Sequence, residues 1–258
     1  MLRSRIHLIG GGPGTLHSLR RHLAALVPSA VPARGARKPL VAYVGAASGD
    51  NAEFQRMIAV EIAAAGARVQ AVKLASPRAK TSAAKALLEG CDVVFMSGGD
   101  VDMGMNVLGE RGLVPLFHDL ARDGRPIIGI SAGSMMLARA WVRFPEPGTR
   151  GRPTVFPCIG VAPVYVDAHA EEDRWAELRT LLRLLVASGE TAPVGYGLTC
   201  DGGISVEPKS RRLQVVPFGT AAPRFIVRNG RVVRGPELAL GSSDAVSARP
   251  PRRQARRS

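Results

Sequence analysis

The sequence predicts an α/β protein of three layers, in which a mostly parallel β-sheet carries helices on both faces. Short apolar runs of strand length alternate with longer segments of helical spacing through the first half of the chain, a pattern typical of strand–helix–strand units. Several shorter strand-like runs follow in the last third of the chain. We therefore expect short C-terminal strands in addition to the parallel sheet.

The first half of the chain accounts for five strands and four helices. The expected strands are 6–9, 40–44, 69–74, 92–96 and 126–130. The expected helices are 15–27, 50–65, 76–88 and 113–122. The first helix repeats leucine at helical spacing, at Leu16, Leu19, Leu23 and Leu26. In sheets of this kind ligands bind at the carboxyl ends of the strands, so we look for the functional site there.

The second half of the chain changes character. Residues 131–142 have helical spacing, 143–157 indicate a loop or hairpin rich in Gly, Pro and Arg, and 171–188 indicate another helix. The last two strands, 224–228 and 231–234, are joined by Asn-Gly, which is a strong hairpin signal. We expect one hydrolytic α/β domain over residues 1–240, followed by a basic, disordered tail over residues 241–258.

The chain is strongly basic, with a formal net charge of +14 at pH 7. The segment 241–258 contributes five Arg and one Asp to this charge. A basic surface can favour polyanions or acidic substrates, but the sequence has no nucleic-acid-binding motif and no interleaving of aromatic and basic residues. We therefore expect a solvated basic surface and no nucleic acid partner.

Cofactors and membranes are not expected either. Cys91, Cys158 and Cys200 are widely spaced and match neither a disulfide framework nor a zinc site. No uncharged apolar run reaches the roughly 18 residues that a membrane span needs, and no signal-peptide pattern opens the chain. These observations predict a cytoplasmic protein without metal or cofactor, and they leave a homodimer open.

The most informative segment is Gly129-Ile130-Ser131-Ala132-Gly133, which follows a buried strand and opens a helix. In this Gly-x-Ser-x-Gly context the serine lies on a tight strand-to-helix turn, and the glycines let the backbone pass. The sequence therefore predicts Ser131 as a nucleophile, with the N–H of Ala132 as one oxyanion donor. Gly99, in the Ser-Gly-Gly-Asp turn after another strand, is the expected second donor.

A serine nucleophile needs a base, and His169 is the best candidate. His7 lies in the first strand, His17, His22 and His118 lie in helices ahead of the serine, and His169 alone follows it. His169 also lies between a strand-like run and a helix, where a loop can present it to Ser131.

The orienting acid is less well defined. A Ser-His-acid order along the chain points to Asp201, after the strand-like segment 194–198. The Ser-acid-His order of ordinary α/β-hydrolases leaves Glu146 and Asp167. Asp167 is only two residues from His169, a poor separation for a partner that must approach Nδ1. We favour Asp201 and keep Glu146 as the second choice.

Residues after the Gly-Gly turn are candidates for substrate binding. We expect Asp100, Val101 and Asn106 to contact the substrate. Three arginines are candidate anchors for a carboxylate: Arg139, Arg143 and Arg174.

Five segments resemble, in the same order, the dipeptidase E/cyanophycinase family of serine peptidases. They are 9–12, 96–100, 129–134, 167–169 and 197–202. The resemblance covers residues 6–233, and its specific part is the Gly-x-Ser-Ala-Gly elbow with the Gly-Gly-Asp turn before it. It implies a class I glutamine amidotransferase-like fold and an acyl-enzyme on Ser131 without a metal. It also implies cleavage of small peptides or isopeptides next to aspartyl residues, with His169 as base and Gly99 and Ala132 as oxyanion donors.

The chain departs from this family at three places. Cyanophycinases have Gln where this chain has Val101, and Gln and Phe where Ala168 and Ala170 flank the histidine. They also have Asp-Glu where this chain has Asp201-Gly202. We therefore expect a substrate pocket unlike that of cyanophycinase.

Three alternatives to a serine peptidase remain open at this stage. One is a non-catalytic binding or regulatory member of the same fold, which the altered flanks of His169 favour. Another is an esterase, which the absence of a late histidine disfavours. The last is a glutamine amidotransferase, which is disfavoured because the elbow carries Ser in place of Cys.

Overall fold

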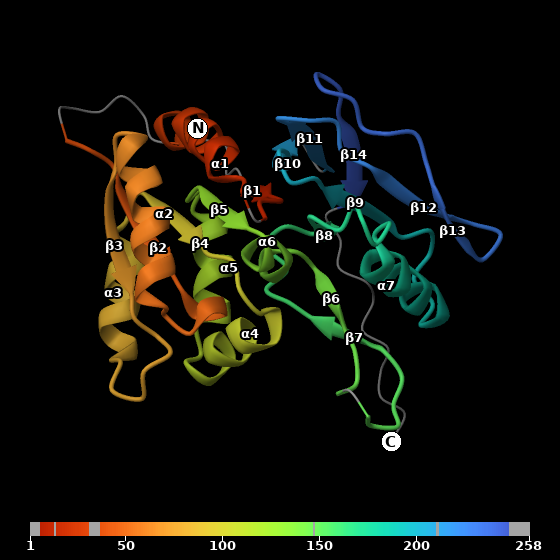
Figure 1. Cartoon of the computed structure of the whole chain (residues 1–258), viewed down its shortest axis with the longest axis horizontal. Helices are drawn as coiled ribbons and strands as arrows, with labels where there is room; N and C mark the ends of the chain where they lie inside the picture. The colour runs from red at the N-terminus through yellow and green to blue at the C-terminus, as the bar shows by residue number, and fades with distance from the viewer. Residues whose placement is uncertain (1–5, 13, 31–36, 147, 210–211, 248–258) are drawn as a thin grey trace.

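The computed structural model describes residues 6–12, 14–30, 37–146, 148–209 and 212–247. Its main feature is an eight-stranded sheet with the order β14-β11-β10-β1-β5-β4-β2-β3 (Figure 1). The five strands predicted in the first half are all present and pair in parallel: β1 Ile6–Ile9, β2 Leu40–Val44, β3 Arg68–Val72, β4 Val93–Met96 and β5 Ile127–Ile130. The predicted parallel sheet is thereby confirmed.

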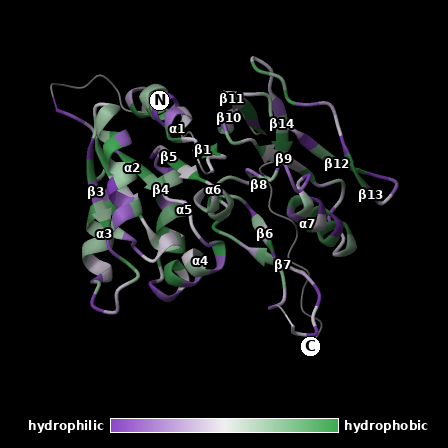
Figure 2. Cartoon of the chain, viewed as in Figure 1, coloured by the Kyte–Doolittle hydropathy of each residue, from purple (hydrophilic) through white to green (hydrophobic). Residues whose placement is uncertain are grey.

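Helices cover both faces of this sheet because alternate strand residues point to opposite sides. On one face α1 Leu16–Ala30 and α2 Ala52–Ala64 pack over strand residues such as Ile9, Tyr43 and Phe95. On the other face Leu8, Val44 and Met96 belong to a core that includes the helices α3 Thr81–Gly90, α4 Val101–Glu110, α5 Val114–Arg122 and α6 Ala132–Leu137. Much of the central sheet is green, the hydrophobic end of the scale, in Figure 2. The three-layer α/β prediction is correct.

Three antiparallel strands extend the main sheet: β10 Gly203–Lys209, β11 Arg212–Phe218 and β14 Asp244–Ser247. β14 falls inside the segment 241–258 that was expected to be disordered. Its Asp244 carboxylate accepts hydrogen bonds from Tyr196 and Arg224, so part of that segment is held by pairing and by side chains. Residues 248–258 lie outside the described residues, and the single domain over 1–240 stays a prediction.

The second half also builds a four-stranded sheet, β13-β12-β9-β8, against α7 Ala176–Ala187 (Figure 1). Its strands are β8 Tyr165–Ala168, β9 Val194–Leu198, β12 Arg224–Arg228 and β13 Arg231–Arg234. The predicted Asn229-Gly230 hairpin joins β12 to β13, with both residues at positive φ. This sheet matters for the site because β8 leads directly into His169.

In the middle of the chain one predicted helix was wrong and another helix was not predicted. The helix expected over 131–142 ends at Leu137, and β6 Ala140–Arg143 pairs with β7 Thr154–Pro157. Trp141 and Phe156 face each other across this hairpin, a cross-strand aromatic contact that favours strands over helix. The helix α4 was not predicted, because Gly104, Asn106 and Gly109 lower its helix propensity. Tertiary packing stabilises this helix instead. Gly104 packs so closely against Met136 of α6 that a Cβ on Gly104 would lie only 2.5 Å from Met136 Sδ.

Candidate active site

Ser131 lies on the turn between β5 and α6, in a strained backbone conformation. Its φ is 52° and its ψ is −123°, a region that costs a non-glycine residue free energy and is often found at functional sites. The turn is held by tight packing: a Cβ on Gly133 would lie 2.3 Å from the carbonyl oxygen of Met96. The glycine at 133 is therefore required by close approach of two backbones, and the serine is forced out of the sheet.

His169 meets this serine from the second sheet. Its Nε2 atom lies 2.8 Å from Ser131 Oγ, at hydrogen-bond distance. The imidazole is presented at the end of β8, where His169 has a φ of 44° and its backbone N–H donates to Leu198 O. The structure thus brings together two residues that are 38 positions apart, as the choice of His169 required.

The other four histidines do not compete for this role. His7 Nδ1 lies 2.7 Å from Ser205 Oγ inside the protein, and His22 Nε2 donates to the backbone oxygen of Asp201. Burial lowers the pKa of His22 below its usual value. His17 and His118 are exposed on α1 and α5.

The turn after β4 lies beside Ser131. A Cβ on Gly98 would lie 3.6 Å from Ser131 Oγ, so the missing side chain leaves room for a substrate carbonyl. Gly99 lines the same cavity as Ser131. Among the described residues, the N–H groups of Gly99 and Ala132 donate to no protein acceptor. Both are thus free to donate to a substrate oxygen.

The hydrogen bonds of the two candidate acids go to residues other than His169. Asp201 is exposed, and its Oδ1 accepts a hydrogen bond of 2.5 Å from Ser18 Oγ in α1. Glu146 is exposed in the β6–β7 connection, where its backbone oxygen accepts from Thr149. Within the described part of the chain, no hydrogen bond joins His169 to a carboxylate. The sequence order alone could not show that Asp201 is engaged by α1.

The candidate substrate-binding residues are not part of the cavity lining. Asp100 caps α4 by accepting from Met103 N, Val101 is 3% exposed in the core, and Asn106 is exposed on α4. These residues lie outside the lining because α4 begins directly after Asp100. The helix carries the following residues away from Ser131.

The candidate carboxylate anchors are also placed elsewhere. Arg139 pairs with Glu190, Arg143 pairs with Asp102, and Arg174 lies exposed before α7. The structure therefore brings none of the three arginines into the lining of the cavity beside Ser131.

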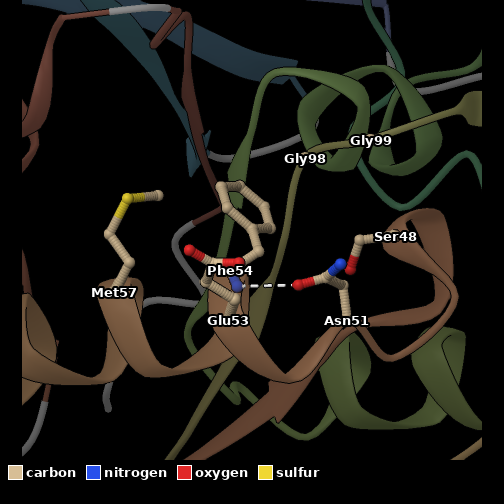
Figure 3. Close-up of a pocket in the computed structure, with 7 residues that line it drawn as sticks. All are labelled: Ser48, Asn51, Glu53, Phe54, Met57, Gly98 and Gly99. Atoms are coloured by element: carbon tan, nitrogen blue, oxygen red, sulfur yellow. Dashed lines mark hydrogen bonds between the residues drawn. The ribbon is translucent and has the colours of Figure 1, made fainter.

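That cavity, which we call the main cavity, has a volume of about 420 Å³ and contains Ser131 and His169 in its lining. Its apolar walls come from α1, α2 and β5, and comprise Leu16, Leu19, Phe54, Met57, Ile58 and Ile130. An adjoining groove of about 490 Å³ shares Phe54, Met57 and the two glycines of the β4 turn with it, and adds Ser48, Asn51 and Glu53 (Figure 3). Both volumes fall in the range of roughly 300–1,000 Å³ that is common for small-ligand sites.

One feature of the sequence pointed to the part of the apolar wall that α1 forms. The glycine run after β1 opens α1 at the carboxyl end of a strand adjacent to β5, which is where ligands bind in parallel sheets. The contribution of α2 had no such local signal.

One buried acid supports the histidine loop. Asp167 lies in β8, is 4% exposed, and its carboxylate accepts from the backbone N–H of Ala168 and more weakly from that of Leu178. Burial, followed by repulsion from Glu177, raises the pKa of Asp167 to about 7. The carboxyl is therefore largely neutral below that pH.

None of the three cysteines lines the main cavity beside Ser131. Cys91, Cys158 and Cys200 are free thiols, and burial raises the pKa of each above its usual value. Within the described residues, no group of His, Cys, Asp and Glu has a geometry suited to a metal ion. In the same residues, no helix is long and apolar enough to cross a membrane.

Comparison with solved structures agrees with this architecture. A peptidase from an acI-B1 actinobacterium matches with a TM-score of 0.68 at 16% identity, over 95% of this chain and 97% of that one. A proposed peptidase E of Listeria monocytogenes EGD-e matches with a TM-score of 0.55 at 13% identity, over 83% and 98% of the two chains. At these identities the likeness concerns the fold. No curated protein matches the sequence.

The sequence pattern of peptidase family S51 matches residues 8–210. This segment contains the parallel part of the main sheet from within β1 onward, the Ser131 turn and the His169 loop. Because the match covers well over half of the chain, the protein belongs to peptidase family S51 and is a serine-type peptidase.

Proposed function

We propose that this peptidase cleaves small peptides or isopeptides through an acyl-enzyme on Ser131. The observation that carries the proposal is the 2.8 Å contact between Ser131 Oγ and His169 Nε2 at the edge of a cavity. A serine hydroxyl is a weak nucleophile at neutral pH, and an adjacent imidazole activates it.

The steps follow from this geometry. His169 accepts the hydroxyl proton while Ser131 Oγ attacks the scissile carbonyl carbon, and the N–H groups of Gly99 and Ala132 donate to the developing oxyanion. His169 then gives the proton to the leaving amine, and the carbon–nitrogen bond breaks. In the second half, His169 takes a proton from water while the water oxygen attacks the acyl carbon. The bond from the acyl carbon to Ser131 Oγ then breaks, His169 returns the proton to Oγ, and the carboxylic acid leaves.

The working unit that we propose is the Ser131–His169 pair. The carboxylate of Asp201 is engaged by Ser18, while the backbone holds His169 through its bond to Leu198 O. A pair of this kind keeps part of the activity of a complete triad. A cytoplasmic location and a preference for aspartyl bonds stay predictions, and the lining of the main cavity bears on the second of these.

A non-catalytic role is the second candidate, because no hydrogen bond joins His169 to a carboxylate among the described residues. Labelling with a fluorophosphonate separates the two candidates. We expect the wild type to form an adduct on Ser131, Ser131→Ala to form none, and His169→Ala to react far more slowly. His118→Ala is the matched control, since His118 is exposed on α5, and it should label like the wild type.

A folded wild type that does not react with the fluorophosphonate would overturn the proposal and favour the binding role. Labelling that persists in Ser131→Ala would place the reactive group elsewhere. If the enzyme reacts, a dipeptide library and the matching 4-nitrophenyl esters are tested next. Cleavage of the amide bonds indicates a peptidase, whereas cleavage of the esters alone indicates an esterase.

A further inference from the structure

The lining of the main cavity differs from what an acidic substrate needs. Six apolar side chains form its walls, and the remaining lining residues are four glycines, Thr15, Ser131 and His169. In the described part of the chain, no Lys or Arg lines this cavity or the adjoining groove. A carboxylate that enters an apolar site without a cationic partner loses its hydration and gains little in return.

Among the described residues that line the adjoining groove, Glu53 is the only one with an acidic or basic side chain, and it is exposed. Figure 3 shows Glu53 and Phe54 side by side on the first turn of α2 and Met57 on the next turn, with the Phe54 and Met57 side chains rising from the same side of the helix. A negative charge at this place repels an acidic side chain and leaves an apolar one unaffected. The local charge therefore runs against the net charge of +14 of the whole chain.

Two of the wall residues are unusually exposed for their type. Leu16 is 40% exposed and Met57 is 38% exposed, and both line the cavity that contains Ser131. Single exposed apolar residues are common on protein surfaces, whereas a group of them around a concave site marks a binding surface. An apolar group that enters the cavity would remove these side chains from water.

The wall is held in place without a ligand. Asp201 fixes α1 twice, through its carboxylate to Ser18 and through its backbone oxygen to His22. Arg20 joins α1 to α2 by two hydrogen bonds, of 2.6 and 3.0 Å, to the carboxylate of Glu61. A preformed apolar site binds its ligand without the entropic cost of ordering the walls.

We propose that the main cavity takes a large apolar side chain next to the scissile bond, so that this peptidase selects apolar over acidic substrates. The proposal rests on the proposed function, because it assigns the substrate class to the same Ser131 site. It replaces the aspartyl preference implied by the family resemblance. Leu16 and Met57 are its specificity-determining residues, since they lie at the exposed part of the wall.

Two fluorophosphonates of equal length test the proposal, one with an isobutyl-ended tail and the other with a carboxylate-ended tail. Their reactive groups are identical, so the ratio of their labelling rates at Ser131 reports the cavity alone. We expect the apolar probe to react about 10- to 100-fold faster, the range that apolar contacts supply in hydrophobic specificity pockets. Equal rates, or faster labelling by the carboxylate probe, would overturn the proposal.

Met57→Lys and Leu16→Lys sharpen the test by adding a cation to the wall. Each should lower the ratio of apolar to carboxylate labelling by roughly tenfold, as expected for opposite charges at short range under partial screening. Val60→Lys is the matched control, because Val60 is 61% exposed on α2 and lines neither cavity. If Val60→Lys shifts the ratio as much as Met57→Lys, the effect comes from net charge and the cavity assignment is wrong.

The labelling experiment distinguishes a failure of the proposed function from a failure of this inference. If neither probe labels the folded wild type, Ser131 is not an activated nucleophile. If both probes label Ser131 without preference for the apolar tail, the nucleophile stands and the apolar specificity falls.

Discussion

The two sides of the main cavity are built by different means. The side that carries Ser131 and His169 depends on backbone features: positive φ angles at both residues and a glycine at 133 that lets two backbones approach. The opposite wall depends on side chains from α1 and α2, such as Leu19 and Phe54. We therefore expect the side with Ser131 and His169 to tolerate little change, and the wall from α1 and α2 to be alterable without loss of the chemistry.

His169→Gln should break the reactive side with the largest effect. Glutamine is polar and of similar reach but cannot accept the Ser131 proton, so we expect a loss of roughly 10²- to 10⁴-fold in the labelling rate. The thermal midpoint should change little. His118→Gln, at an exposed site on α5, serves as the control, and a rate loss below tenfold for His169→Gln would remove His169 from the mechanism.

Gly133→Ala tests whether the Ser131 turn depends on backbone approach. Its Cβ would lie 2.3 Å from Met96 O, so we expect the free energy of unfolding to fall by about 1–3 kcal/mol, as for other overpacked sites. Urea denaturation measures the loss. Gly109→Ala is matched to it, because a Cβ at Gly109 meets nothing within 4 Å. The control should be neutral or stabilising, and equal losses in both variants would contradict the argument.

Asp167→Asn tests the support beneath the histidine loop. The pKa of Asp167 is raised from 3.8 to about 7 in the fold, so the native protein holds this proton more tightly than the unfolded chain. The stability that this proton contributes is complete below the pKa of Asp167 in the unfolded chain. It is lost as the pH rises toward 7, where the free energy of unfolding falls by roughly 1 kcal/mol per pH unit.

Urea midpoints at pH 5, 6, 7 and 8 measure that slope. Asp167→Asn should flatten it, because the amide has no proton to lose, whereas Asp123→Asn at an exposed helix end should leave it as in the wild type. The same slope in Asp167→Asn and the wild type would show that the buried carboxyl does not titrate in this range.

Asp201→Asn should have the smallest effect and distinguish two roles for this residue. If Asp201 holds α1 through Ser18, Asp201→Asn and Ser18→Ala should each change the labelling rate by less than about tenfold, a loss no larger than one hydrogen bond accounts for. If Asp201 orients His169, Asp201→Asn alone should lose about 10⁴-fold. The rate ratio of the two variants decides between the roles.

Features that depend on neighbouring residues were predicted correctly, whereas features that depend on contacts between distant residues were predicted wrongly or not at all. The parallel strands were predicted because each is a local apolar run, and the β12–β13 hairpin because Asn229-Gly230 determines its own turn. The helix over 131–142 was predicted wrongly, since pairing of Trp141 with Phe156 competes with local propensity. Contacts between distant residues also explain why β14 was not predicted, since its Asp244 is held by Tyr196 and Arg224.

By itself, the sequence determined the fold class and pointed to Ser131 and His169 as a pair, because a strand, a glycine-flanked serine and a single late histidine are visible along the chain. The tertiary structure alone decided that Asp201 faces Ser18 and that Asp100, Val101 and Asn106 miss the cavity. It also decided that Leu16 and Met57 form the wall beside Ser131. The physical reason is that a turn conformation is encoded by neighbouring residues, whereas the lining of a cavity depends on how separate helices pack against one sheet.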